Sequence, residues 1–125
     1  MQLPEKDIAY LYDIYTCCID IQCLINELTP YDFEKDKFKR LAVERSFEII
    51  GIASNKISNE TKELLQAVPW KKMIGFRNIL AHDYGEIRIE KMWSIARNSI
   101  PVLKNEIEKL DEMKRYFETI LAENS

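Results

Sequence analysis

The chain has 125 residues, of which 46% are hydrophobic and 31% are charged. This length and balance predict a single globular domain over residues 1–125 with one modest core, and they exclude a disordered chain. The net charge of -3 at pH 7 argues against a protein that coats nucleic acid through overall positive charge. Basic stretches at residues 35–40 and 70–72 leave a local basic patch open, although acidic neighbours of the first favour a solvated helix start.

The lengths of the apolar runs and the spacing of the cysteines argue against membrane, secreted and metal-binding proteins. We expect no membrane span, because no apolar run reaches the length that crosses a bilayer, and no signal peptide, so we expect a cytoplasmic protein. Cys17, Cys18 and Cys23 lack CxxC spacing and have no nearby cysteine or histidine to complete a metal site. We interpret them as small apolar fillers on a helix, and we predict no metal and no other cofactor.

Apolar residues recur at steps of three and four along most of the chain, which is typical of amphipathic helices. Prolines, glycines and capping side chains divide this pattern into segments. We expect five helices: from Pro4 to Thr29, from 32–36 to about Lys56, from Asn59 to about Ala67, from Trp70 to about His82, and from Ile89 or Glu90 to about Leu121. Pro101 lies inside the fifth and clashes with the carbonyl of Arg97, so we expect a kink there and not a break.

The second helix carries two apolar rows, which predicts that it is buried on more than one side. One row is Val43, Phe47, Ile50 and Ile57, and the other is Phe38, Ala42, Ile49 and Ile52. Gly51 would let another backbone approach this helix closely. Because no alternating strand pattern and no internal repeat occurs, the sequence predicts an all-α fold, an antiparallel bundle of four to five helices.

The stretch RNILAHDY contains the single histidine of the chain, His82. On an ideal helix each residue turns about 100°, so Asn78 and His82 are neighbours one turn apart, on the front that also carries Arg77. Phe76 and Leu80 point roughly the other way, toward the core. Arginine can hold a phosphate and histidine can move a proton near neutral pH, so this front suits phosphodiester chemistry.

A plainer interpretation stays open at this point. A lone histidine near a helix C-terminus is explained by a favourable charge at the negative end of the helix dipole. Arg77, one turn back, could pair with Glu48 of the second helix. Under that interpretation the stretch only stabilises the fold.

The segment PWKKMIGFRNILAHDY resembles the signature of HEPN-domain proteins of the HepT-like branch. The motif of that branch is an arginine, four residues, a histidine, one residue and a tyrosine. Arg77, His82 and Tyr84 fit this motif without gaps, and Asn78 and Asp83 also match. The segments at 40–58 and 93–103 resemble the second long helix and the last helix of the family, so the resemblance covers nearly the whole chain.

The resemblance implies a four- to five-helix bundle that forms a two-fold homodimer and acts as a metal-independent RNase toxin. It makes Arg77 and His82 catalytic, with Asn78 and Asp83 in support. The implied partner is an MntA-like nucleotidyltransferase antitoxin, which would add AMP to Tyr84 and which could form a hetero-oligomer with the toxin. The substrate is RNA, and both transfer RNA and messenger RNA stay open. Cleavage of RNA needs an acid and a base, and a symmetric dimer would supply two histidines.

One departure from the family puts a residue role in doubt. Where many relatives have Gly-Glu-Ala in the second helix, this chain has Gly51-Ile52-Ala53, so any role of that glutamate is missing or passes to Glu48 or Glu44. The alternative function is a non-catalytic helical module that binds a nucleotide or serves as an adaptor for the nucleotidyltransferase. The Arg, Asn and His on one helix front favour the enzyme, because a scaffold has no need of them.

Overall fold

The structure of the chain is a computed structural model that describes residues 3–82 and 85–124. All regular secondary structure in these residues is helical, which confirms the all-α class. The elements in chain order are α1 (Glu5–Ile25), α2 (Pro30–Lys35), α3 (Lys37–Lys56), α4 (Asn59–Leu64), α5 (Trp70–Ile74), α6 (Phe76–His82), α7 (Gly85–Ser94), the π-helix η1 (Ile95–Ser99), α8 (Ile100–Glu108) and α9 (Asp111–Asn124).

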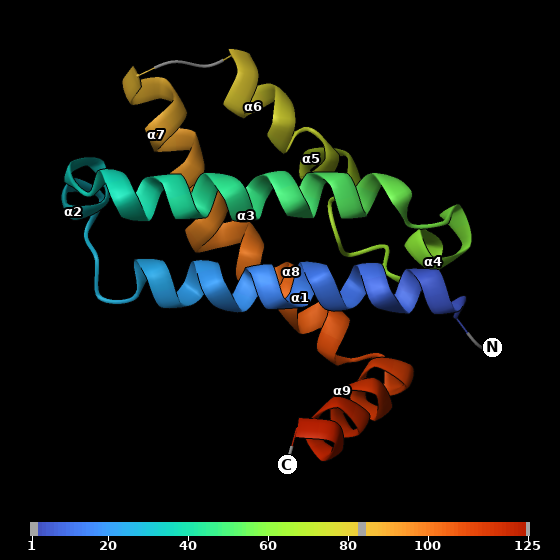
Figure 1. Cartoon of the computed structure of the whole chain (residues 1–125). Helices are drawn as coiled ribbons and strands as arrows, with labels where there is room; N and C mark the ends of the chain where they lie inside the picture. The colour runs from blue at the N-terminus through green and yellow to red at the C-terminus, as the bar shows by residue number, and fades with distance from the viewer. Residues whose placement is uncertain (1–2, 83–84, 125) are drawn as a thin grey trace.

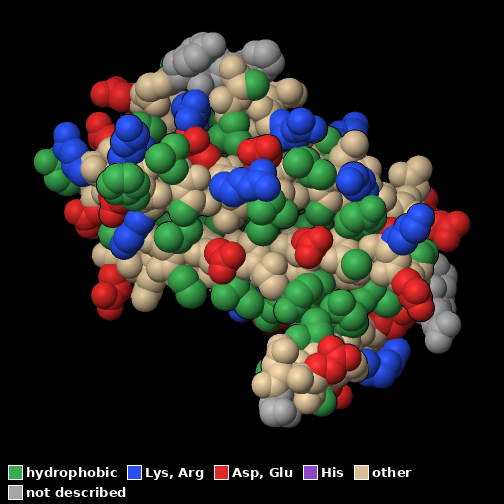
Figure 2. All heavy atoms as spheres, in the orientation of Figure 1, with side chains coloured by type: hydrophobic (Ala, Val, Ile, Leu, Met, Phe, Trp, Pro, Cys, Tyr) green, Lys and Arg blue, Asp and Glu red, His purple; other side chains and the backbone are tan. Residues whose placement is uncertain are grey.

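The two long helices α1 and α3 lie side by side and antiparallel, and the other elements pack around them (Figure 1). Helices α5 and α6 run along one side of α3, while α7, η1 and α8 form a nearly continuous rod that crosses behind the pair. On the face shown in Figure 2, Lys and Arg side chains lie along α3 and the helices above it, with acidic side chains among them.

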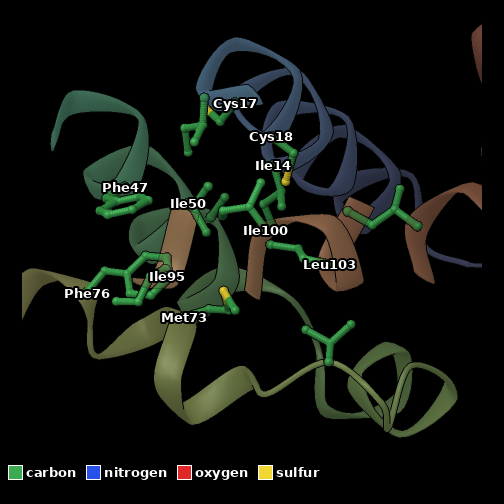
Figure 3. Close-up of a cluster of buried hydrophobic side chains, with 14 of the residues drawn as sticks. Ile14, Cys17, Cys18, Phe47, Ile50, Met73, Phe76, Ile95, Ile100 and Leu103 are labelled. Atoms are coloured by element: carbon green, nitrogen blue, oxygen red, sulfur yellow. The ribbon is translucent and has the colours of Figure 1, made fainter. Parts of the chain in front are cut away.

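The core sits where α1, α3 and α8 meet, and it extends to the underside of α5 and α6 (Figure 3). Ile14, Ile50 and Leu103 are fully buried there. The ring centroids of Phe47 on α3 and Phe76 on α6 are 4.7 Å apart, and both side chains are buried. This aromatic pair fixes α6 against α3, because such pairs add to the apolar area that they remove from water.

The predicted second helix is confirmed as α3, which is capped by Asp36 and ends at Lys56, but the short helix α2 before it was not predicted. Helix α2 begins at a capping box, in which Thr29 and Asp32 accept each other's backbone N–H at 3.1 Å. The chain then leaves the helical conformation at Asp36, whose carboxylate accepts the backbone N–H of Lys39 at 3.0 Å and starts α3. A side chain that caps a helix satisfies donors that have no partner within the helix, which makes the break inexpensive.

The predicted fourth helix is divided at Gly75. The Gly75 N–H donates to the carbonyl of Lys71 at 2.9 Å and ends α5, and its own carbonyl accepts the N–H of Asn78 at 3.0 Å at the start of α6. A Cβ at this position would lie 3.1 Å from the Lys71 carbonyl oxygen. Glycine therefore permits the tight turn that redirects the chain from α5 into α6.

The irregularity expected at Pro101 is a π turn. The N–H of Ile100 donates to the carbonyl of Ile95, five residues back, and Pro101 occupies the first turn of α8. Proline lacks an N–H and clashes with the carbonyl four residues before it, so a wider turn just ahead of it removes the conflict. The predicted fifth helix also starts earlier, at Gly85, and is interrupted between Glu108 and Asp111.

The first and third helices are shorter than expected. Helix α1 ends at Ile25 and not near Thr29, because the chain turns at Glu27, which has a positive φ of 63°. Helix α4 ends at Leu64, three residues before Ala67. Apolar periodicity continues past both ends, so it could not mark them.

Helix α1 has the length and apolar composition of a membrane-spanning helix, so the expectation that no segment reaches them is wrong. Its side chains Leu11 and Ile14 are fully buried against the rest of the bundle, which is the environment of a core helix. Cys17 and Cys18 are buried on the same side, as expected of fillers, and burial raises the pKa of Cys17 to about 11. Cys23 is exposed, so the interpretation as a filler is wrong for this residue.

The buried carboxylate of Asp7 ties the start of α1 to α4. It accepts the backbone N–H of Ser58 at 3.2 Å and the hydroxyls of Ser58 and Thr61, each at 2.5 Å. Burial raises the pKa of Asp7, but these hydrogen bonds outweigh it and hold the pKa below its ordinary value. The tie fixes the turn through which the chain leaves α3 and returns to the site.

Candidate functional site

A cavity of about 550 Å³ lies between α3 and the α5–α6 segment, and it holds the described part of the predicted site. Its volume is within the range of pockets that take small ligands. It is lined by Gly51, Asn55, Lys71, Ile74, Gly75, Arg77, Asn78 and Ala81. The structure therefore brings Arg77 and Asn78 together in one concave place.

Helix α6 has the apolar back and polar front that the sequence predicts. Phe76 is fully buried and Leu80 is half-buried against the core, whereas Arg77 and Asn78 are exposed. Residues one position apart on a helix turn by about 100°, so burial of Phe76 directs Arg77 away from the core. The aromatic contact of Phe76 with Phe47 thus determines which way the polar front faces.

Gly51 is where α3 passes closest to the site. A Cβ on Gly51 would lie 3.3 Å from Cγ of Arg77, 3.4 Å from the carbonyl oxygen of Met73 and 3.7 Å from that of Ile74. The close approach predicted from Gly51 is confirmed, and the partner is the turn between α5 and α6. The stem of the Arg77 side chain rests on α3 at this point.

The electrostatic surroundings of Arg77 leave its charge available. Glu48, its predicted alternative partner, instead lies 3.3 Å from Arg45, and Arg77 has no ion-pair partner among the described residues. The interpretation of Arg77 as one half of a pair with Glu48 is therefore wrong. Exposed charges held over a concave surface are the groups that attract an anion.

The cavity at Arg77 also differs from the other cavities in that no described carboxylate lines it. Its lining contains two cations and two amides and no carboxylate. Four other cavities on the described residues each include at least one Asp or Glu side chain in their lining. In a chain of net charge -3, a lining with two cations and no carboxylate favours an anionic ligand.

The remaining motif residues are only partly described. Helix α6 ends at His82, as expected, but the side chain of His82 lies outside the described residues, as do Asp83 and Tyr84. The chain resumes at Gly85, which starts α7 with a positive φ of 59°. Glycine adopts this conformation at little cost, so Gly85 can start α7 without backbone strain.

Glu44 and Glu48, the possible replacements for the glutamate that this chain lacks at Ile52, lie outside the cavity at Arg77. Neither Glu48 nor Glu44 is in the lining of the cavity at Arg77. Glu44 forms an ion pair with Arg88 of α7, whose guanidinium also donates to the carbonyl of Leu80 at 3.4 Å, near the end of α6. This network holds α6, α7 and α3 together next to the site.

Sequence reasoning missed one residue of the cavity and undervalued another. Asn55 gave no signal, because a polar residue on a helix is typical of a solvated surface. Lys71 was noticed only as part of a short basic stretch. Knowing that Gly51 marks a close approach could have indicated Asn55, since residues four apart share a helix face. No group of three or more His, Cys, Asp or Glu side chains that could hold a metal occurs in the described part of the chain.

Comparison with known proteins identifies relatives over most of the chain. Residues 14–110 match the family model described as "Ribonuclease HepT-like". "Putative RNase MJ1380" of Methanocaldococcus jannaschii is 38% identical over 107 residues, which make up 85% of this chain and 98% of the relative. "Probable ribonuclease HepT" of Thermococcus cleftensis is 37% identical over 110 residues, or 88% of this chain and 98% of the relative. No solved structure matches the chain significantly.

The contact at Gly51 leads to a prediction. We expect Gly51→Ala to lower activity toward RNA by about tenfold, because the added methyl displaces the Arg77 side chain. Stability should change by less than about 1 kcal/mol, because crowding is offset by the greater helix preference of alanine. Cleavage assays and urea unfolding measure the two effects.

The control for this change is Ser54→Ala, three residues later on the same helix. Ser54 is fully buried and its hydroxyl has no hydrogen-bond partner among the described residues, so its loss should alter neither activity nor stability strongly. Full activity in Gly51→Ala would show that the position of Arg77 does not depend on this contact.

Proposed function

The chain belongs to the HepT-like ribonuclease family, and on this premise we propose that it cleaves RNA at the cavity of Arg77 and Asn78. The observation that carries the proposal is the charge of that cavity, which has cations and amides and no carboxylate in its lining. RNA is a polyanion, and its phosphates are bound most effectively by guanidinium and ammonium groups. We also propose that the protein is a toxin and that it acts in the cytoplasm.

In the proposed reaction, a 2′-hydroxyl of the RNA attacks the adjacent phosphorus. The bond from phosphorus to the 5′-oxygen breaks, which leaves a cyclic phosphate and a 5′-hydroxyl. His82 takes the proton of the 2′-hydroxyl or gives one to the leaving 5′-oxygen. A second histidine for the other transfer comes from a second copy of the chain.

Arg77 stabilises the charge that develops on the phosphate oxygens during this reaction. Its guanidinium can donate two parallel hydrogen bonds to one phosphate, and a preorganised donor of this kind is worth about 10²–10³ in rate. Asn78, next to it on α6, supplies an amide that orients the phosphate or the imidazole. Asp83, outside the described residues, is proposed as a supporting residue on the family resemblance alone.

We propose that the chain forms a two-fold homodimer and that the apolar row of Phe38, Ala42, Ile49 and Ile52 on α3 lies at its interface. Phe38 and Leu41 of this helix are 82% and 47% exposed, so the bundle leaves part of its apolar surface uncovered. Asn55, a lining residue of the cavity, lies less than one turn beyond Ile52 of the same row. A dimer that covered this row would therefore bring two cavities to the edges of one interface.

We further propose that an MntA-like nucleotidyltransferase neutralises the toxin by adding AMP to Tyr84. In the sequence this residue stands between the end of α6 and the start of α7, beside the motif helix. An added AMP would bring phosphate charge and a base close to Arg77, which could bind that phosphate in place of RNA.

The catalytic proposal predicts cleavage of total cellular RNA by the purified protein. His82→Ala and Arg77→Ala should each lower the rate by about 100-fold or more, as expected for the loss of a general acid–base or a phosphate-stabilising group. Arg115→Ala, which removes an exposed arginine of α9, should leave the rate unchanged. Gel analysis of the products also reveals whether transfer RNA or messenger RNA is cut.

The same assay tests the metal-independent mechanism. Acid–base chemistry needs no metal ion, so cleavage should persist in EDTA. Activity that is lost with EDTA and restored by magnesium would contradict the mechanism. A wild-type protein that folds and binds its antitoxin but cleaves no RNA would favour the non-catalytic adaptor instead.

The dimer proposal predicts that the wild-type chain sediments as a dimer at micromolar concentration. Phe38→Glu should produce a folded monomer, since Phe38 is exposed in the single chain and contributes little to its core. Leu121→Glu, at a 69% exposed position on α9, serves as the control and should stay dimeric. A monomeric wild type would refute the dimer.

The antitoxin proposal predicts an adduct of AMP mass on Tyr84 after co-expression with a neighbouring nucleotidyltransferase. Tyr84→Phe should lose both the adduct and the neutralisation of toxicity, while Tyr31→Phe, at a tyrosine that is 67% exposed, should keep both. Mass spectrometry of the purified chains decides the point. Neutralised toxin with unmodified Tyr84 would mean that the antitoxin acts by binding alone.

A further inference from the structure

The cavity at Arg77 extends beyond the motif to a second cation. Lys71, on α5, and Asn55, on α3, complete its lining, and neither belongs to the motif of Arg77, His82 and Tyr84. The α5–α6 turn at Gly75, itself a lining residue, brings Lys71 and Arg77 to the same cavity. Two cations six residues apart in sequence therefore serve one concave surface.

The charge of Lys71 is available to a ligand. Lys71 is exposed and has no ion-pair, hydrogen-bond or ring partner for its ammonium among the described residues. Lys62 of α4, by contrast, lies over the ring of Trp70. Lys72, next to Lys71 on α5, is also exposed but is not in the lining. The cavity thus selects one of two adjacent lysines, which point about 100° apart on a helix.

A chain of phosphates is the anion that fits such an arrangement. Arg77 can bind one phosphate. Lys71 lies at a separate position in the same cavity, so it can bind a second negative charge of the same ligand. Single-stranded RNA presents consecutive phosphates along a flexible backbone, so two of them can reach the two cations that line one cavity of about 550 Å³.

We propose that Lys71 binds the phosphate next to the scissile one, so that the cavity holds two consecutive phosphates of single-stranded RNA, one at Arg77 and one at Lys71. This inference rests on the proposed function for the identity of the scissile phosphate. Asn55, on the opposite wall, is placed to donate to the ribose or base between the two phosphates. Lys71 is a substrate-binding residue in this account and takes no part in proton transfer.

The proposal is tested by the salt dependence of binding. The probe is a fluorescent single-stranded oligonucleotide whose 2′-hydroxyls are replaced by fluorine, so that it binds but cannot be cleaved. Each phosphate contact contributes about 0.7 to the slope of log affinity against log salt concentration for a single strand. We expect Lys71→Gln to reduce the slope by about 0.7 and Lys72→Gln, the matched control, to leave it unchanged. Lys71→Arg, which keeps the charge, should restore it.

Cleavage kinetics provide the second readout. Lys71→Gln should raise KM for an RNA oligonucleotide by about fivefold at low salt while kcat stays the same, because an exposed charge contributes modestly to binding. A dinucleotide with one phosphodiester has no second phosphate, so its cleavage should be insensitive to this substitution.

The outcomes separate this inference from the proposed function. Equal effects of Lys71→Gln and Lys72→Gln, or no binding of the probe by the wild type, would overturn the role of Lys71. If the wild type binds the probe in a Lys71-dependent manner but cleaves no RNA, the two-phosphate site stands and the nuclease proposal fails.

Discussion

The close contact between α3 and the α5–α6 turn is the constraint on which the site depends. At Gly51 the two backbones approach so nearly that an added methyl would touch both the Arg77 stem and the Met73 carbonyl. The aromatic contact of Phe47 with Phe76 holds the helices at that distance. Backbone atoms and buried rings make this contact. The stem of Arg77 is therefore held in place while its guanidinium has no ion-pair partner among the described residues.

The distribution of ion pairs follows from the same arrangement. Arg88 lies a short distance from the site, and its charge is matched by Glu44 in a pair that joins α7 to α3. Arg77 and Lys71 have no such partner among the described residues. An acidic protein can still attract RNA if its unmatched cations share one concave place, since screening limits the effect of distant carboxylates to about 10 Å at moderate salt.

Periodicity in the sequence was enough to predict the helical class, the buried row of α3 and the apolar back of α6. The sequence also indicated the close approach at Gly51, because glycine in the middle of a helix is destabilising and often marks a place where another backbone comes near. The short helix α2 and the break at Gly75 were not predicted, since only local hydrogen bonds mark the change of direction. Asn55 was not predicted, because its polar side chain is typical of a solvated helix surface and only its spacing of four residues from Gly51 links it to the site.

The central claim is that RNA occupies the cavity between α3 and the α5–α6 segment. The most direct measurement is photo-crosslinking of the protein to a single-stranded RNA that carries 4-thiouridine, followed by mass spectrometry of the crosslinked peptides. The account predicts crosslinks in the peptides that contain residues 51–55 and 71–81, and their loss when unlabelled single-stranded RNA competes. Crosslinks confined to α9, or to the acidic surface where α2 meets α7 at Glu34 and Glu90, would contradict it.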